Sequence, residues 1–366
     1  MKRLIPTLFC PLLLAGCAKP DAPPNVDLPA DVAAEVTIMT FNVENLFDTQ
    51  DDEGKDDHTY LPRAVKDDPA HIALCEPLEV ERWRRDCLTL DWTEEALDFK
   101  LGQIAQAILQ VNDGRGPDII AFQEVENAAV LTRLSTDYMA AAGYGDAILI
   151  EGQDLRGIDV AFLSRLPVVG SPVHHDFEAS GFPDRQPDTR GVLEATFELP
   201  DGTRLTGFSV HFPAPFHPIE MRELAYDHLN ALRADVPPDH FVFAAGDFNT
   251  PLREVTGTSI LDDRARPFWT IAHEVDCEGC KGTNYWSRGQ SWSFLDTIFF
   301  SPANAADSDW RIKTGGVFIA DQYPDQLNDD GTVKRFDLGA LEGVSDHLPM
   351  VMTLQAASAK QDSHAP

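Results

Sequence analysis

Short apolar runs, rich in β-branched and aromatic residues, recur along most of the chain and alternate with polar segments that contain Gly, Pro, Asp and Asn. Such runs predict buried or half-buried strands, because Val, Ile, Thr and Phe suit a pleated surface and the flanking residues favour turns. The predicted strands cover residues 36–41, 118–124, 147–150, 158–164, 189–198, 204–211, 241–245, 293–300, 311–319 and 349–355. The fold is therefore expected to begin near residue 36.

Other segments have the spacing of helices, and these cover residues 93–111, 127–142 and 220–233. In the first of them, Leu97, Leu101 and Ile104 follow one another at intervals of three or four residues, which places them on one face of a helix. Helices fall between only some of the strands. This mixture predicts sheets packed on each other with helices outside, and not a strictly alternating parallel barrel.

The segment 48–91 is polar, rich in Asp and without clear periodicity. We interpret it as a long surface excursion and as a candidate wall of the functional site. The folded domain is then expected to span residues 36–357, followed by a short tail at 358–366.

The first residues have the pattern of a secretory signal, because Lys2 and Arg3 precede an apolar run that is too short to span a bilayer. The run ends in Leu14-Ala-Gly-Cys17, which resembles the bacterial lipobox. This resemblance implies a lipoprotein signal at 1–17, with Cys17 as the lipidated first residue of the mature chain. An ordinary signal with a chance cysteine is the alternative.

Residues 18–35 follow as a polar, Pro-rich tether of the kind that holds a domain away from a surface. Ala18, directly after the cysteine, favours the outer membrane over the inner one by resemblance to the sorting rules of such lipoproteins. We therefore expect an exported chain that contacts the bacterial outer membrane through its lipid anchor. No protein partner is implied.

The chain has 366 residues, of which 43% are hydrophobic, and a formal net charge of -31. Its length and composition allow a large core. Proteins that hold long nucleic acid displace phosphate counterions with Lys and Arg, so this excess of carboxylates predicts weak non-specific affinity unless basic residues cluster or cations bind. A small or cation-bridged substrate fits better, although an acidic exported protein would also have this charge.

Outside the signal and the lipobox, four cysteines remain. In an oxidising compartment they suggest disulfides, and the shortest pairings are Cys75 with Cys87 and Cys277 with Cys280. Zinc held by the two distant pairs is the alternative, although only the second pair has Cys-x-x-Cys spacing.

Polar residues that carry ligand or proton-transfer chemistry stand where apolar runs stop, as scaffolds often arrange their sites. They are Asn42, Glu44, Glu124, His211, Asp247, Asn249, Asp296, Asp346 and His347. Taken singly, each suits an Asx-turn or a solvated strand end. Taken together, they supply oxygen ligands for a hard cation, a group that orients water and donors for charge that develops on a phosphate. Because the set includes no Cys or Ser nucleophile, it indicates direct attack by water.

Six short motifs resemble, in their order along the chain, those of the endonuclease/exonuclease/phosphatase superfamily. They are Thr40-Phe-Asn42, Gln123-Glu124, Ser209-Val-His211, Gly246-Asp-Phe-Asn249, Leu295-Asp296 and Ser345-Asp-His347. This superfamily includes pancreatic-type deoxyribonuclease, AP endonucleases, neutral sphingomyelinases and inositol polyphosphate 5-phosphatases. The resemblance covers roughly residues 36–355 and implies a four-layer α/β sandwich, with two central mostly antiparallel sheets flanked by helices.

The resemblance also implies a metal-dependent hydrolase of phosphodiesters or phosphomonoesters. Glu124 is the implied principal ligand of Mg²⁺, with Asn42 close by and Asp346 as a second ligand. Mn²⁺ and Ca²⁺ stay open as alternatives.

Catalytic roles follow from the same resemblance. Asp247 is expected to activate or orient the attacking water, with Asn249 beside it. Asp296 is expected to hold His347 so that the other ring nitrogen faces the phosphate, and a carboxylate there favours the charged ring. His211 is expected to bind the phosphate or to help protonate the leaving group.

Two further residues occupy the segment where relatives place a support for the phosphate-binding histidine. Asp159 is therefore a candidate to orient His211, and Arg156 is a candidate phosphate contact. The stretch from Phe212 to His217 departs from the basic or tryptophan residues that follow this histidine in many bacterial nucleases of the superfamily. Three hypotheses stay open: an esterase for small or lipid-linked phosphates, an exported nuclease for DNA or RNA, and a non-catalytic binding lipoprotein.

Overall fold

The structure, a computed structural model, describes residues 34–301 and 310–356. The expected signal with Cys17, nearly all of the tether and the tail at 358–366 lie outside the described residues. In the described part of the chain, no helix combines the length and the apolar character needed to cross a membrane.

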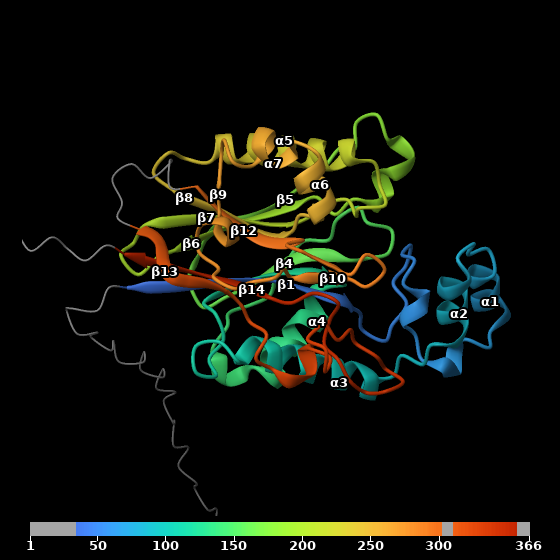
Figure 1. Cartoon of the computed structure of the whole chain (residues 1–366). Helices are drawn as coiled ribbons and strands as arrows, with labels where there is room; N and C mark the ends of the chain where they lie inside the picture. The colour runs from blue at the N-terminus through green and yellow to red at the C-terminus, as the bar shows by residue number, and fades with distance from the viewer. Residues whose placement is uncertain (1–33, 302–309, 357–366) are drawn as a thin grey trace, which may run out of the picture. The chain divides into compact units, whose positions relative to one another are not determined.

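Two six-stranded sheets form the centre of the fold (Figure 1). In the first sheet β1 pairs with β2 in parallel, and the other neighbouring strands are antiparallel. In spatial order its strands are β13 (Trp310–Ile319), β14 (Met350–Ala356), β1 (Glu35–Leu46), β2 (Ile119–Val125), β4 (Asp159–Ser164) and β3 (Ile148–Leu149).

The second sheet repeats this arrangement, because β7 and β8 are parallel and the other pairs are antiparallel. In spatial order its strands are β5 (Val168–His175), β6 (Val192–Glu198), β7 (Arg204–His211), β8 (Phe241–Asp247), β12 (Asp296–Ser301) and β9 (Thr270–Ile271). A separate hairpin joins β10 (Asn284–Trp286) to β11 (Ser291–Ser293).

The sheets pack face to face, and helices cover their outer faces (Figure 1). Buried residues of both sheets, such as Ile38, Phe162 and Phe243, form the apolar layer between them. The outer layer on the first sheet consists of α3 (Glu94–Leu109) and α4 (Ala128–Arg133), and that on the second includes α5 (Ile219–Asp235), α6 (Leu252–Gly257) and α7 (Ile260–Arg264). The four-layer α/β sandwich that the resemblance implied is confirmed.

Local sequence explains where the main helices begin. The Thr93 hydroxyl accepts a hydrogen bond from the Ala96 amide at 3.3 Å, which caps α3. The predicted helix at 127–142 is divided: α4 ends at Arg133, and a π turn and a 3₁₀ turn follow it. Ser135 donates to the Thr132 carbonyl at 2.9 Å, and such side-chain bonds compete with regular helix.

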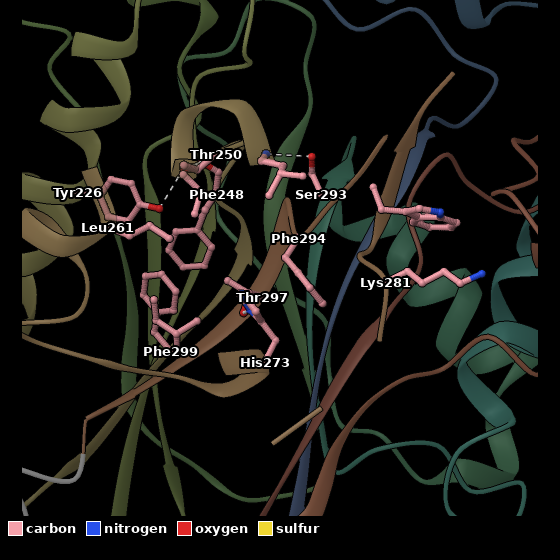
Figure 2. Close-up of a pocket in the computed structure, with 14 residues that line it drawn as sticks. Tyr226, Phe248, Thr250, Leu261, His273, Lys281, Ser293, Phe294, Thr297 and Phe299 are labelled. Atoms are coloured by element: carbon pink, nitrogen blue, oxygen red, sulfur yellow. Dashed lines mark hydrogen bonds between the residues drawn. The ribbon is translucent and has the colours of Figure 1, made fainter. Parts of the chain in front are cut away.

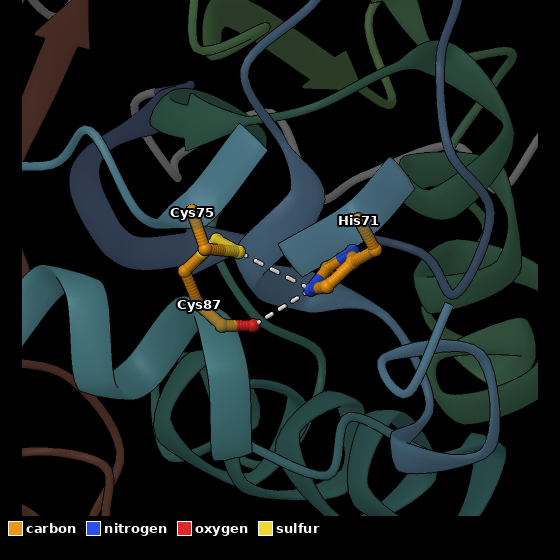
Figure 3. A group of neighbouring side chains, drawn as sticks. All are labelled: His71, Cys75 and Cys87. Carbon is orange, nitrogen blue, oxygen red and sulfur yellow. Dashed lines mark hydrogen bonds between the residues drawn. A yellow bond between two sulfur atoms is a disulfide. The ribbon is translucent and has the colours of Figure 1, made fainter. Parts of the chain in front are cut away.

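The excursion at 48–91 contains two helices that the pattern did not predict, α1 (Pro69–Cys75) and α2 (Glu81–Thr89). Most of their residues are exposed, so no apolar stripe marks them in the sequence. The Cys75–Cys87 disulfide joins them, and His71 Nε2 lies 3.3 Å from Cys75 Sγ (Figure 3).

The second disulfide joins Cys277 and Cys280, so both predicted pairings are present. Disulfide sulfurs are not thiolate ligands, and the zinc alternative is therefore wrong. Strand β5 was also missed, because it lies at a sheet edge with mostly exposed side chains and lacks an apolar run.

Candidate active site

The motif residues converge because strands of both sheets end at the same edge. Strand register places His211 beside Asp247 on neighbouring parallel strands, and Asp296 opposite Asp247 on the antiparallel neighbour. Asn42 reaches across from the first sheet, and its amide nitrogen lies 3.2 Å from Asp247 Oδ2 and 3.3 Å from Glu124 Oε1. One amide thus links carboxylates of the two sheets.

Asp247 stands at the centre of this cluster. Its Oδ1 accepts a hydrogen bond from the Asn249 amide at 2.8 Å, while its Oδ2 lies 3.6 Å from His211 Nε2 and 3.9 Å from His347 Nε2. Burial raises the pKa of Asp247 to about 7, and the negative charge of Asp296 acts in the same direction. The carboxyl group is therefore set to exchange a proton near neutral pH.

The backbone on either side of Asp247 has strict steric demands. A Cβ on Gly246 would lie 2.0 Å from the Val210 carbonyl oxygen, so only glycine lets β7 and β8 approach at this point. Asn249 has a φ of 49°, a left-handed conformation that Asn tolerates. Its side-chain amide donates to the Phe212 carbonyl at 3.0 Å and fixes the loop.

His347 is held by a buried carboxylate. Its Nδ1 lies 2.6 Å from Asp296 Oδ2, and Asp346 Oδ1 lies 3.8 Å from its Nε2. Burial lowers the pKa of His347, but the charges of Asp296, Asp346 and Asp247 outweigh burial and raise it well above its usual value. This environment favours the imidazolium form of His347, whose Nε2 faces Asp247.

His211 has the opposite environment. Its Nε2 faces Glu124 Oε1 at 3.9 Å and Asp247 Oδ2 at 3.6 Å, whereas its Nδ1 is buried and has no hydrogen-bond partner. Burial, with the positive charges of Arg190 and Arg156, lowers the pKa of His211 well below its usual value. The ring is neutral, and the carboxylates in front of Nε2 favour the tautomer with its proton there.

The expectation that Asp159 orients His211 is wrong. Asp159 is 2% exposed, and its Oδ1 accepts a hydrogen bond from the Gly152 amide at 2.8 Å. No hydrogen bond joins it to His211 within the described residues. Its carboxylate therefore holds the loop before β4.

Glu124 points into the site because its strand is irregular there. The register of β2 against β4 shifts between Gln123 and Val125, and Glu124 has a φ of 64°. Such a bulge turns a side chain away from its regular direction. Glu124 Oε2 accepts from the Asn45 amide at 3.0 Å, and Oε1 is the oxygen that faces Asn42 and His211.

A model of the endonuclease/exonuclease/phosphatase family matches residues 39–347. The chain belongs to this family.

Similar solved structures share its fold. A family protein from Bacteroides thetaiotaomicron is 17% identical, with a TM-score of 0.53 over 89% of this chain and 99% of that chain. A mannosyl-6-phosphatase of B. thetaiotaomicron VPI-5482 is 17% identical, with a TM-score of 0.52 over 87% of this chain and 99% of that chain. D. rerio TDP2 complexed with single strand DNA product is 16% identical, with a TM-score of 0.52 over 87% and 98%. No curated protein matches the chain.

Two charged residues near this family site were not predicted. Arg335 donates to Glu44 Oε1 at 2.6 Å and its NH2 nitrogen lies 3.2 Å from Asp346 Oδ2, so it joins two acidic side chains at the rim. Arg190 is 6% exposed, and its Nε lies 2.9 Å from Asp154 Oδ2. Neither arginine stands in a recognisable motif, which is why the sequence did not indicate them.

Arg156 is half exposed, and its Nε lies 3.8 Å from Asp154 Oδ1. It is close enough to His211 to lower the pKa of that ring, so its charge belongs to the site. The role of Arg156 as a phosphate contact stays a prediction.

An apolar pocket of about 260 Å³ lies between β8, β12 and the neighbouring loops, as its lining residues show (Figure 2). Phe248 and Thr250 belong to its wall, and His273 Nδ1 lies 2.7 Å from Thr297 Oγ1 at the same wall. The catalytic candidates do not line it, so this pocket is not the reaction centre.

Proposed function

We propose that the chain is a metal-dependent phosphoesterase that hydrolyses a phosphodiester or phosphomonoester by direct attack of water. The main support is the position of Asp247, whose Oδ2 faces a neutral His211 and a charged His347. Hydrolysis of a phosphate ester at neutral pH is helped by a base whose pKa lies near 7. It is also helped by donors that stabilise charge on the phosphate, and here one imidazole ring is charged and the other neutral.

The donor set fits a hard divalent cation. Glu124 and Asp346 offer carboxylate oxygens, whereas the Asn42 amide nitrogen donates to Glu124 and Asp247 and holds their carboxylates in place. The negative charge of Glu124 also helps to raise the pKa of Asp247, and a cation would offset this repulsion. A bound Mg²⁺ would polarise a phosphoryl oxygen and stabilise charge on the leaving oxygen; Mn²⁺ and Ca²⁺ are the alternatives.

The protein groups have separate tasks in this proposal. Asp247 takes the proton of the attacking water, and the Asn249 amide keeps its carboxylate oriented. The imidazolium of His347 donates from Nε2 to a phosphate oxygen, and Asp296 holds that charge in place. His211 donates from Nε2 to a second phosphate oxygen. Its neutral ring favours phosphate binding over protonation of the leaving group, the two roles that the sequence left open.

The substrate we favour is a small or cation-bridged phosphate ester, because the chain has a net charge of -31. A nuclease is the second candidate, and it is supported by the similarity in fold to TDP2 with its single strand DNA product.

A substrate panel tests the proposal. p-Nitrophenyl phosphate, bis-p-nitrophenyl phosphate, plasmid and single-stranded DNA are each incubated with Mg²⁺, Mn²⁺ or Ca²⁺ at low salt. We expect hydrolysis of a small ester by the wild-type protein, none by Asp247→Asn, and unchanged hydrolysis by Asp239→Asn, a matched change at an exposed position. Equal rates of hydrolysis by the wild type and Asp247→Asn would contradict the proposal. Faster cleavage of DNA than of the small esters would favour the nuclease.

We also propose that the chain is exported and lipid-anchored at Cys17. The two disulfides support an oxidising compartment. Labelling of cells with radioactive palmitate should mark the wild-type protein in the membrane fraction. Label on Cys17→Ser equal to that on wild type would contradict the anchor.

A further inference from the structure

A second group of carboxylates lies where the excursion leaves β1. Asp52 and Asp57 come from the root of the excursion, and Glu126 follows the end of β2. The backbone holds these segments together, because the Glu126 amide donates to the Leu46 carbonyl at 3.0 Å and Glu126 Oε2 accepts from the Asp48 amide. Residues far apart in the sequence are thus fixed side by side.

Each of the three side chains places one carboxylate oxygen near an oxygen of the other two. These oxygens all lie within 4.8 Å of one another. Asp57 is 1% exposed and Glu126 is 3% exposed, so two of the three carboxylates are removed from bulk water. Such a concentration of buried negative charge is costly unless something offsets it.

Each buried carboxylate is satisfied on one side only. Asp57 Oδ2 accepts from the Asp52 amide at 2.8 Å, whereas Asp57 Oδ1 is buried and has no hydrogen-bond partner. Glu126 repeats this pattern, with Oε2 on the Asp48 amide and Oε1 buried without a partner. Two residues of the same cluster therefore each keep a buried oxygen that has no hydrogen-bond partner.

Nearby basic groups do not balance the cluster. The ammonium of Lys55 donates to the Asp154 carbonyl at 3.1 Å. His58 Nδ1 lies 2.8 Å from Asp51 Oδ1 and 3.6 Å from Asp57 Oδ1, which is too long for a hydrogen bond. In the described ranges no Lys or Arg lies within ion-pair distance of Asp52, Asp57 or Glu126.

We propose that Asp52, Asp57 and Glu126 bind a Ca²⁺ ion at a second cation site, separate from the reaction centre. The ligands are all oxygens, and two of the three residues belong to a loop that can add carbonyl oxygens or water. Ca²⁺ takes six to eight oxygen ligands in a flexible geometry, whereas Mg²⁺ demands a strict octahedron, so the arrangement suits Ca²⁺ better. The ion ties the root of the excursion to the end of β2, two residues after Glu124. Its role is to hold the excursion at 48–91 in a fixed position next to the strand end that carries Glu124.

Stoichiometry separates this site from the reaction centre, which also offers oxygen ligands. The purified protein is freed of metal with EDTA and titrated with Ca²⁺ in a calorimeter at physiological salt. We expect Glu124→Gln, with the reaction centre weakened, to retain one Ca²⁺ per chain. Glu124→Gln combined with Asp57→Asn or Glu126→Gln should bind none. Glu124→Gln combined with Asp56→Asn should still bind one, because Asp56 is the exposed neighbour of Asp57.

Thermal unfolding gives a second readout in the same variants. Ca²⁺ at a hundred times its Kd should raise the Tm of Glu124→Gln and of its Asp56→Asn combination by about 5 °C, and it should not change the Tm of the Asp57→Asn combination. Absence of Ca²⁺ binding by Glu124→Gln would overturn the proposal even if the other variants fail to fold. Equal binding in the Asp57→Asn and Asp56→Asn combinations would also overturn it, since the ion would then sit elsewhere.

Discussion

The two histidines of the reaction centre face the same carboxylate from different parts of the fold, yet the protein holds them in opposite charge states. His347 precedes β14, and its Nδ1 lies 2.6 Å from the buried Asp296. His211 ends β7, and its Nδ1 is buried without a partner. Three carboxylates, with Asp296 first among them, raise the pKa of His347, whereas burial and the charges of Arg190 and Arg156 lower that of His211.

This difference gives each side of the site a distinct task. In the proposed mechanism, the His347 side supplies positive charge toward Asp247 and the phosphate. The His211 side supplies a neutral donor, and its positive charge comes instead from Arg156 and Arg190. A charged His347 lowers the pKa of Asp247, and a second charged ring would lower it further. Burial and the charge of Asp296 oppose His347 and hold this pKa at about 7.

The largest effect is expected when the His347 side is converted to resemble the His211 side. Asp296→Asn keeps the size of the side chain but removes the charge that holds the imidazolium. We expect kcat/KM to fall by about 10²–10⁴-fold, in the range of lost acid–base or electrostatic stabilisation.

Steady-state kinetics, with circular dichroism to verify the fold, measure this loss. Asp239→Asn is the matched control at an exposed position. A rate for Asp296→Asn within a factor of about three of that control would show that the charge of His347 is not used, because a lost catalytic group costs far more.

A smaller effect is expected when the His211 side is displaced through the backbone. Gly246→Ala places a methyl group 2.0 Å from the Val210 carbonyl oxygen and forces β7, which carries His211, away from β8. We expect a loss of roughly 1–3 kcal/mol in the free energy of unfolding, as for overpacked interiors. Urea denaturation measures it. Gly257→Ala is the control: its Cβ would have no neighbour within 4 Å, so the free energy of unfolding should change little. Equal stability of the two variants would show that β7 accommodates the methyl group without cost.

The smallest effect is a pair of opposite pH dependences in stability. The pKa of His211 is lowered in the folded protein, so its contribution is intact above the unfolded value near 6.5 and is lost as the pH falls below it. The pKa of His347 is raised, so its contribution is present below that value and is lost as the pH rises toward the folded pKa. Each slope has a limit of about 1.4 kcal/mol per pH unit.

Urea titrations from pH 5 to pH 9 in EDTA test these slopes. Relative to wild type, His211→Gln should lose less stability on the acid side, and His347→Gln should lose less on the alkaline side. Identical slopes in both variants would mean that the two rings are not in opposite charge states.

Much of the fold and of the site follows from the sequence, because its signals are local. Helix α3 has an apolar stripe and a Thr93 cap, and strand β7 has the bounds that its apolar run predicts. Strands β1 and β8 extend past the predicted strands, to Leu46 and Asp247, and therefore include the motif residues Asn42 and Asp247. The resemblance placed Asp296 on His347, and the structure shows this contact at 2.6 Å.

The parts that the sequence did not predict depend on contacts between distant segments. The Asp159 carboxylate accepts a hydrogen bond from the Gly152 amide and not from His211. Its place in the sequence could not show this contact, nor that Nδ1 of His211 has no hydrogen-bond partner. Arg190 acts through a buried pairing with Asp154, and no spacing in the sequence marks it. Helices α1 and α2 are short and largely exposed, and a disulfide holds them instead of an apolar face.

Dependence of hydrolysis on a divalent cation at Glu124 tests the proposed function most directly. The fastest ester of the substrate panel is incubated with EDTA-treated protein, and Mg²⁺ is added back in steps to the wild type and to Glu124→Gln. We expect saturable recovery of the wild-type rate and, since a metal ligand is lost, recovery at least about 10²-fold weaker in the variant. Full activity in EDTA, or equal recovery by both proteins, would contradict a metal-dependent phosphoesterase.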